Sequence, residues 1–383
     1  MDKLFLIDAY ALVYRSYYAF INNPRVNSKG LNTSAIMGFC NTLNEVLTKE
    51  QPTHIGVAFD HGLTFRHEAY PQYKAQREET PEDIKLAVPI IKQILEAMRI
   101  PILQVDGFEA DDVIGTVATR AGVDGIETFM LTPDKDYGQL IRPNVYMYRP
   151  RHGGGYEQIG EKQIQDKYGI ATPQQVIDLL ALMGDSADNF PGCPGVGEKT
   201  AAKLINQFGS IENMLEHTDE IKGKLREKVE AAVNDIKISK YLATIRLDVP
   251  VDIRWDDLKV EQPDVEKLRT IFTELEFKTL LKKFVNEPQQ TQKKDDSQLD
   301  LFAVNQDKDQ EMPEKTKFDS LKTVSTDYKL IDNEKEAITI RDFFLTKQIL
   351  SIDTETTSTD PIDAELVGLS FAVEEKKAFY VPI

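Results

Sequence analysis

Short apolar runs alternate with helical patterns through the first part of the chain, and this alternation limits the possible folds more than any other feature. The runs are KLFLIDAY, HIGVAFDHG, IPILQVDGF and IETFMLTPDKD, and a helix-like stretch follows each one. Such alternation is typical of a parallel sheet with helices on both faces. We therefore predict an α/β fold, in which binding sites form beyond the carboxyl ends of the strands.

Three aspartates stand at or just past the ends of these runs, namely Asp8, Asp60 and Asp134. A single aspartate in this position commonly caps the following helix. The ends of parallel strands meet at one edge of a sheet, however, so the three carboxylates are expected to share one rim.

Three more carboxylates crowd together in GFEADDVIG, where Glu109, Asp111 and Asp112 fall within four residues. Like charges at this spacing repel unless cations lie between them. Glu109 and Asp111 reach one ion only if a helix begins at about this point, and Gly107 permits the necessary turn. The alternative is an acidic first turn that the helix dipole favours.

Two further pairs have a similar character. Asp134 and Asp136 lie on one side of an extended segment, and Asp185 and Asp188 lie on one face of a helical turn. Solvated or capping turns are the alternatives for both pairs.

Taken together, these acidic residues favour metal-assisted hydrolysis of a phosphodiester. That reaction uses two cations about 3.5–4 Å apart, and Mg²⁺ prefers oxygen ligands. The sequence offers no evident Ser/His/Asp or Cys/His arrangement and no GKS or GKT loop. The candidate metal ligands are Asp8, Asp60, Glu109, Asp111, Asp112, Asp134, Asp136, Asp185 and Asp188.

A glycine-rich turn before a helix, GCPGVGEKTAAKLI, is the first candidate for DNA binding. Backbone N–H groups at such a turn can face a phosphate without reading base sequence. An ordinary helix–helix hairpin is the alternative. The candidate contacts are Gly195, Val196, Gly197, Lys199, Thr200 and Lys203.

A second candidate segment interleaves aromatic and cationic side chains after Asp60. It contains Arg66, Tyr73, Lys74 and Arg77. Such residues can stack on bases and hold the phosphates of a single strand. An exposed amphipathic helix is the alternative.

The net charge of −17 argues against a nucleic-acid binder only at first sight, because about half of the acidic excess lies after residue 286. Two cysteines are too few for a disulfide framework, and no run reaches the ~20 apolar residues of a membrane span. These features favour a protein of the reducing cytoplasm that does not enter a membrane.

The pattern changes twice along the chain. Helical periodicity replaces the strand signal after residue 172, and residues 288–324 are polar and charged, which is typical of a linker. Strand-like runs then resume in residues 325–383, where three strands without partners suggest a truncated domain. We expect this last segment not to fold stably alone, because its edges and one face would stay uncovered.

Five motifs in order resemble the 5′ nuclease family found at the front of bacterial DNA polymerase I. They are LFLIDAYALVYR, the segment AFDHGLTFRHEAYPQYKAQREETPEDI, GFEADDVIG, LTPDKDYGQLI and GDSADNFPGCPGVGEKTAAKLI. The resemblance implies a PIN-like (resolvase-like) nuclease core in residues 1–172. It also implies a helix-hairpin-helix module in residues 173–287, with a potassium ion near its turn.

The same resemblance implies roles for individual residues. One Mg²⁺ or Mn²⁺ ion would be held by Asp8, Asp60, Glu109 and Asp111, and a second by Asp134, Asp136 and Asp188, with Asp112 and Asp185 nearby. Lys74 and Arg77 would lie in a helical arch and steer the scissile phosphate, while Arg15 and Tyr73 would contact substrate.

The implied function is that of a 5′-3′ exonuclease and flap endonuclease of bacterial DNA polymerase I. It would act as a monomer in the bacterial cytoplasm, on DNA with 5′ flaps, nicks or RNA primers, during primer removal and repair. The alternatives are a non-catalytic DNA-junction binder and an RNA nuclease of the PIN type. Nine retained carboxylates argue against the first, and the glycine-rich turn argues against the second.

The segment SIDTETTSTDP resembles the first motif of a 3′-5′ exonuclease domain of the RNase H-like type, with Asp353 and Glu355 as its would-be ligands. A solvated strand end is the alternative for such a short motif. The remaining proofreading carboxylates and a polymerase domain do not occur in this sequence, so we expect neither activity from it.

Overall fold

The computed structural model describes residues 2–151, 154–285, 327–347, 349–357, 365–374 and 377–383. Contacts divide the chain into two units, Met1–Ala303 and Val304–Ile383. The predicted linker, residues 288–324, lies outside the described residues. None of the helices in the described ranges has the length and apolar character needed to span a membrane.

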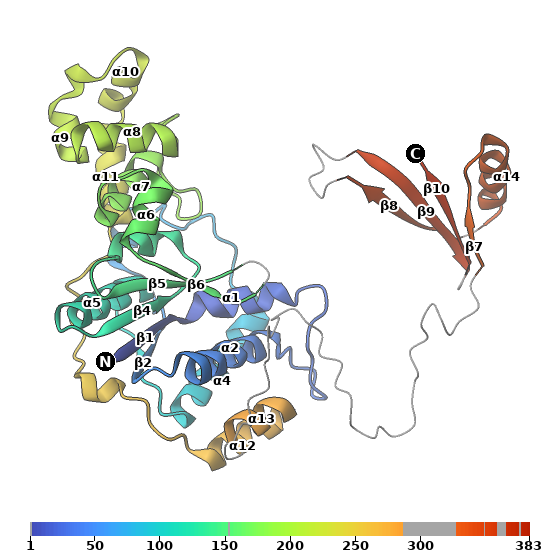
Figure 1. Cartoon of the computed structure of the whole chain (residues 1–383), viewed down its shortest axis with the longest axis horizontal. Helices are drawn as coiled ribbons and strands as arrows, with labels where there is room; N and C mark the ends of the chain where they lie inside the picture. Colours follow the sequence, from blue (N-terminus) through green and yellow to red (C-terminus); the bar gives the residue numbers. More distant parts are fainter. Residues whose placement is uncertain (1, 152–153, 286–326, 348, 358–364, 375–376) are drawn as a thin grey trace. The chain divides into compact units, whose positions relative to one another are not determined.

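A six-stranded sheet forms the centre of the larger unit (Figure 1). Its strands are β1 (Lys3–Asp8), β2 (His54–Ala58), β3 (Ile102–Leu103), β4 (Glu127–Leu131), β5 (Val145–Pro150) and β6 (Tyr156–Ile159), in the order β3-β2-β1-β4-β5-β6. The first five are parallel, and only β6 runs antiparallel to its neighbour β5. The predicted parallel α/β sheet is therefore confirmed.

Helices cover both faces of the sheet because successive side chains in the middle of the central strand, which point to opposite faces, are all apolar. In β1, Phe5 and Ile7 belong to one core, and Leu4 and Leu6 belong to the other, with all four fully buried. Burial of each such side chain contributes about 1.5–3 kcal/mol. One face carries α1 (Ala9–Ala19), α2 (Ser34–Glu45) and α4 (Glu82–Ala97), and the other carries α5 (Ala110–Val123).

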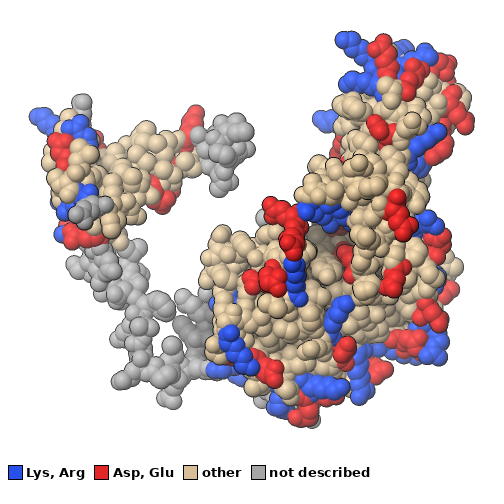
Figure 2. Space-filling model, turned by 180° about the vertical axis from the view of Figure 1, so that it is seen from behind, with Lys and Arg blue, Asp and Glu red and all other residues tan. Residues whose placement is uncertain are grey.

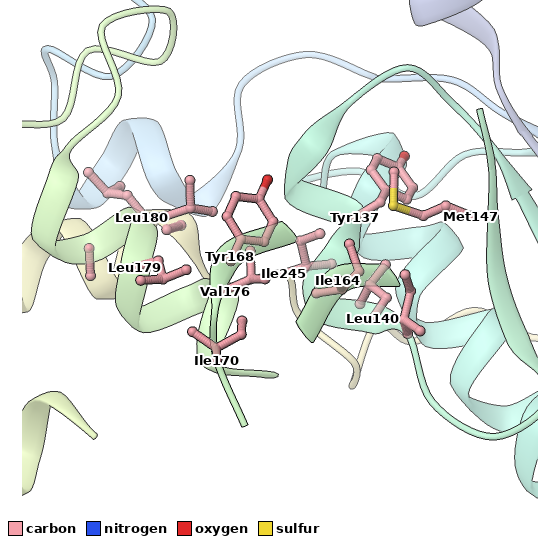
Figure 3. Packing of buried hydrophobic residues seen from close by; sticks show 14 of the residues in the cluster. Tyr137, Leu140, Met147, Ile164, Tyr168, Ile170, Val176, Leu179, Leu180 and Ile245 are labelled. Atoms are coloured by element: carbon pink, nitrogen blue, oxygen red, sulfur yellow. The ribbon is translucent and has the colours of Figure 1, made fainter. Parts of the chain in front are cut away.

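A group of helices follows β6, as the loss of strand signal after residue 172 predicts. They are α6 (Glu161–Tyr168), α7 (Val176–Met183), α8 (Glu198–Phe208), α9 (Ile211–Glu216), α10 (Lys224–Ala231) and α11 (Val233–Ala243). Their apolar side chains continue the core of the sheet, because Ile164 and Val176 cluster with Leu140 from the short helix η2 (Lys135–Leu140) (Figure 3). This shared core fixes the helical part against the sheet.

The last two helices that the structure describes in the larger unit return to the helices of its first core. After α11 the chain passes α5, where Arg120 donates to the carbonyl oxygens of Val249 and Val251 at 3.1 and 2.9 Å. Helices α12 (Val265–Glu274) and α13 (Lys278–Val285) then pack on α4 and α2. We predicted these residues as part of the second domain, but their packing places them in the core of the first.

The described residues of the smaller unit form a four-stranded sheet with one helix. It contains β7 (Asp327–Leu330), α14 (Glu334–Leu345), β8 (Ser351–Thr356), β9 (Leu366–Glu374) and β10 (Lys377–Pro382), in the strand order β7-β10-β9-β8. Phe344 of α14 packs against Phe371 and Phe379 of the sheet. The three predicted strands are present as β8 to β10, and the structure adds β7 and α14. Its RNase H-like character stays a prediction.

Candidate active site

The predicted rim of carboxylates lies where the order of the parallel strands reverses, between β1 and β4. Asp8 is the last residue of β1, and Asp60 and Asp134 follow the ends of β2 and β4. Ligands bind α/β sheets in the crevice at such a reversal. A cavity of about 470 Å³ opens there. It is lined by the predicted carboxylates Asp8, Asp60, Glu109, Asp111 and Asp134, and also by Glu78.

Hydrogen bonds fix two of the carboxylates that line this cavity, Asp8 and Asp60. Asp8 caps α1 by accepting from the Ala11 N–H at 3.1 Å, and its other oxygen accepts from the hydroxyl groups of Thr132 and Tyr137 at 3.2 and 3.3 Å. Asp60 accepts from the Ala110 N–H at 2.7 Å, which ties the end of β2 to the start of α5. Burial, followed by the nearby Asp60, raises the pKa of Asp8 to about 7.

Helix α5 begins where the acidic cluster requires it to begin. Gly107 has φ of +82°, Glu109 is the N-cap residue, and the helix starts at Ala110. Both Glu109 and Asp111 therefore reach the cavity. Burial, followed by the charge of Asp112, raises the pKa of Asp111 well above its usual value.

The third carboxylate of the cluster, Asp112, lines neither cavity, which contradicts a direct role as a metal ligand but agrees with the alternative that it lies behind the ligands. Its two oxygens accept from the Arg66 guanidinium at 2.7 and 2.8 Å and from the N–H groups of Glu109 and Arg246 at 3.1 and 2.8 Å. Asp112 is fully buried, and its oxygens already have partners.

Arg66 is also not available for DNA, contrary to prediction. Only 1% of this residue is exposed, and its guanidinium donates further to the carbonyl oxygens of Leu242 and Thr244 at 2.8 and 2.9 Å. Arg66 thus ties α3 (Phe65–Ala69) to α5 and to the end of α11. This buried ion pair holds the elements that surround the cavity.

The segment predicted as a helical arch is irregular between α3 and α4. Tyr73 is buried, and its hydroxyl lies within donating distance of both Glu109 and Asp188, at 3.0 and 3.1 Å, so its ring cannot stack on a base as predicted. Lys74 does line the cavity, with its Nζ 2.8 Å from Glu109 Oε1, and Arg77 donates to Asp188 at 2.5 Å. Burial raises the pKa of Glu109, but Lys74 and Arg66 more than offset it and lower that pKa.

A second cavity, of about 610 Å³, adjoins the first through Asp134 and Arg77, which line both. Its other carboxylates include Asp136, Asp185 and Asp188. Asp185 accepts from Lys135 Nζ at 2.7 Å. The structure thus brings eight of the nine predicted carboxylates, all except Asp112, to two neighbouring cavities.

Two buried carboxylate oxygens in these cavities lack a hydrogen-bond donor, Oδ1 of Asp111 and Oδ1 of Asp136. Burial, followed by the charge of Asp134, raises the pKa of Asp136 well above its usual value. Buried anionic oxygens without donors fit a cation, because a cation would satisfy them. In the described part of the chain, however, no three His, Cys, Asp or Glu side chains converge on one point as they stand.

The glycine-rich turn before α8 has the expected backbone but not every expected contact. Gly195 and Gly197 are exposed, and Gly195 has φ of +76°. Val196 is buried and its N–H donates to the Cys193 carbonyl at 3.0 Å, so the structure contradicts its assignment to DNA binding. Of the other predicted contacts, Lys199 and Lys203 are exposed, and Arg15 and Thr200 are half-buried.

Several cavity residues were not predicted from the sequence. Tyr10, Tyr14 and Tyr137 line the first cavity, and Lys135 binds Asp185 in the second. Their proximity in sequence to Asp8 and Asp134 was the only available signal. Lys228 was missed as well, although its ammonium lies beside Gly195, 2.6 Å from where a Cβ would stand.

Positive and negative side chains alternate over the visible face of the larger unit, around a hollow (Figure 2). No uniformly basic surface stands out in this view. Binding of a polyanion here would therefore depend on individual lysines and arginines and on backbone N–H groups rather than on net charge.

Two family models match the chain in succession. Residues 3–169 match the N-terminal resolvase-like domain of 5′-3′ exonucleases, and residues 171–266 match their C-terminal SAM fold. The chain is 38% identical over 283 residues to the 5′-3′ exonuclease of Aquifex aeolicus, which covers 74% of this chain and 95% of that protein.

Longer relatives are similar too. The chain is 44% identical over 285 residues to DNA polymerase I of Bacillus caldotenax, covering 73% of this chain and 32% of that protein, so it spans about a third of that relative's length. DNA polymerase I of Chloroflexus aurantiacus is 34% identical over 403 residues, covering 99% of this chain and 41% of that protein.

Solved structures share the fold of the larger unit. The phage T5 5′-exonuclease with bound zinc ions has a TM-score of 0.54 at 19% identity, covering 74% of this chain and 97% of that one. The catalytic core of Rad2 in complex with DNA substrate has a TM-score of 0.51 at 16% identity, covering 75% of this chain and 93% of that one.

Proposed function

The chain belongs to the 5′-3′ exonuclease family, and we propose that it cuts DNA where a single-stranded 5′ flap joins a duplex. The observation that carries the proposal is the gathering of five predicted carboxylates in one cavity at the ends of the parallel strands, with the buried Oδ1 of Asp111 left without a donor. A set of oxygen ligands of this kind suits hydrolysis that depends on hard divalent cations.

Mg²⁺, with Mn²⁺ as a substitute, is the ion we propose for both cavities. Asp8, Asp60, Glu109 and Asp111 would hold one ion, and Asp134, Asp136, Asp185 and Asp188 would hold the other. Divalent ions at such positions activate a water molecule and stabilise the leaving oxygen. The unpaired oxygens of Asp111 and Asp136 lie one in each cavity, which supports two ions rather than one.

Lys74 and Arg77 complete the proposed site from the protein's own residues. Both are bound to carboxylates in the structure, Lys74 to Glu109 and Arg77 to Asp188. When ions neutralise those carboxylates, the two cations become free to hold the scissile phosphate, since lysine and arginine donate strongly to phosphate oxygens. We propose that this exchange of partners positions the phosphate between the two cavities.

Duplex DNA would be held through the turn before α8. The exposed backbone of Gly195 and Gly197, with Lys199 and Lys228 nearby, offers donors to phosphate oxygens but none to base edges. We expect binding that depends on salt and not on base sequence. A potassium ion at this turn is part of the proposal.

Its relatives suggest the wider setting. We propose that the chain acts as a monomer in the bacterial cytoplasm, as part of a DNA polymerase I, removing RNA primers and acting at nicks during repair. In the smaller unit, Asp353 and Glu355 lie on the exposed edge strand β8. They are proposed as part of a second nuclease site that the described residues do not complete.

One observation favours a second candidate, a junction binder that does not cut. In the described residues the carboxylates pair with lysine and arginine rather than converging in threes. If these ion pairs outcompeted metal, the chain would bind flap DNA without hydrolysis.

Metal titration separates the two candidates. Binding of Mn²⁺ can be followed by electron paramagnetic resonance. We expect two Mn²⁺ sites in the parent chain and one site in each of the variants Asp111→Asn and Asp136→Asn. Asp178→Asn is the matched control, because Asp178 is also buried but pairs with Lys240 outside the cavities. Absence of Mn²⁺ binding to the parent chain would favour the junction binder.

A further inference from the structure

We propose that the exposed ring of Tyr18 stacks on an unpaired nucleobase of the substrate strand, one step outside the acidic cavity. This proposal rests on the function proposed above. It adds a base-stacking site on α1, a helix in which the sequence predicts no such site. Three tyrosines of one helix carry the argument.

Tyr10, Tyr14 and Tyr18 are spaced four residues apart and therefore follow one side of α1. The ring centroids of successive members of this tyrosine row lie 6.3 Å apart in both steps. Tyr10 and Tyr14 line the cavity that contains Asp8 and Asp60. The row therefore starts at the carboxylates and leads outward over roughly 12 Å, at 1.5 Å per residue.

The outer end of the row is held in place, although it is open to solvent. The Tyr14 hydroxyl is 3.0 Å from the hydroxyl of Thr80, another residue that lines the cavity, and this contact fixes the middle ring of the row. Tyr18 stacks on Tyr14 with an angle of 22° between the rings, and Tyr17 packs edge-on against Tyr18 at 5.3 Å. Even so, 55% of Tyr18 is exposed. An ordered aromatic ring with a free surface is ready to stack on another flat group.

The chemistry of this surface points to an unpaired base rather than to a base pair. Bases inside a duplex are stacked on one another and offer only their edges, so a tyrosine ring meets a base face in a single strand or at the last pair of a duplex. The row is continuous with the cavity in which we propose the cut, so the occupant is the strand that leaves that cavity. Tyr73, which we expected to stack on this strand, is buried and cannot do so.

The test combines one protein variant with one altered nucleotide. Flap DNA is bound in EDTA, so that it is not cut, and single abasic nucleotides are placed in turn along the flap beside the junction. For the parent chain, we expect one of these positions to weaken binding by about fivefold or more, which is the lower end of base–aromatic stacking. We expect Tyr18→Ala to bind the intact flap more weakly than the parent chain by the same factor. Its affinity should not fall further when the abasic nucleotide is placed at that position.

Two controls make the result specific. Tyr328→Ala removes a tyrosine of similar exposure, 57%, from the smaller unit, and it should bind like the parent chain. Tyr18→Trp should retain binding, because any large aromatic ring can stack. Urea unfolding of Tyr18→Ala, followed by the fluorescence of Trp255, shows whether the larger unit is intact.

The outcomes are distinguishable. If Tyr18→Ala binds flap DNA as tightly as Tyr328→Ala, this inference is wrong while the proposed function stands. The same holds if the loss of affinity in Tyr18→Ala adds to the loss caused by the abasic nucleotide at every position. If the parent chain neither binds nor cuts flap DNA, the proposed function fails and this inference fails with it.

Discussion

Replacing Arg66 with methionine should destabilise the larger unit by about 3–5 kcal/mol, because removing one partner leaves a buried charge uncompensated. Methionine keeps the apolar stem but removes the guanidinium, which holds both oxygens of Asp112 at 2.7 and 2.8 Å. Asp112 is fully buried and Arg66 is 1% exposed, so water cannot replace the lost bonds. The carbonyl oxygens of Leu242 and Thr244 also lose their donors.

The assay is urea unfolding followed by the fluorescence of Trp255. This residue is the only tryptophan of the chain, and its ring N–H donates to Asp124 at 2.9 Å within the larger unit. Arg226→Met is the matched control, since Arg226 forms a solvent-exposed pair with Glu230. Surface pairs contribute little, so this control should unfold like the parent chain.

A double-mutant cycle then tests the pairing itself. Asp112→Asn should cost much less in the Arg66→Met background than in the parent chain, because the carboxylate has already lost its partner there. We expect a coupling free energy of about 2 kcal/mol or more, in line with contacting residues of one network. Strictly additive losses would refute the idea that these two side chains stabilise the fold as a pair.

Four further predictions follow from the site and the smaller unit. Because the pKa of Asp8 is raised to about 7, the contribution of this side chain to the stability of the metal-free fold is lost as pH rises from about 4 to about 7. The urea midpoint of Asp8→Asn in EDTA should therefore exceed that of the parent chain most above about pH 7. Equal gains at pH 4 and pH 8 would contradict this. Asp111→Asn should abolish cutting but still bind flap DNA in a gel shift, because other residues hold the DNA. An equal loss of cutting and of binding would contradict this separation of roles. Lys74→Met should bind Mn²⁺ more tightly without DNA, because its ammonium no longer competes for Glu109, whereas Lys74→Arg should not. Residues 327–383 should be digested in limited proteolysis, and a resistant fragment would show that this unit folds stably.

The sheet and its rim could be predicted because the relevant signals are local. Each apolar run is a few residues long and ends in an aspartate, and parallel strands bring such ends together whatever lies between them. The return of α12 and α13 to the first core could not be predicted this way. Their apolar faces could pack against any core, and only long-range contacts with α2 and α4 select this one.

The wrong predictions in the site also arise from long-range contacts that the sequence does not show. Arg66 and Tyr73 look like exposed DNA contacts in the sequence, because charge and aromatic character say nothing about burial. Asp112, the partner of Arg66, lies 46 residues away along the chain, and the hydroxyl of Tyr73 reaches Asp188 across 115 residues. Val196 was misassigned because its neighbours, the exposed Gly195 and Gly197, define the turn while its own side chain enters the core.

The most direct test of the account is cleavage of a 5′-labelled flap DNA by the parent chain with Mg²⁺, by the parent chain with EDTA, and by Asp134→Asn with Mg²⁺. Asp134 lines both cavities, so its replacement should affect both proposed ions. We predict a short product cut near the junction, formed only by the parent chain with Mg²⁺. Tight flap binding without cutting would support the junction binder instead, and cutting that persists in EDTA or in Asp134→Asn would contradict a metal-dependent site in these cavities.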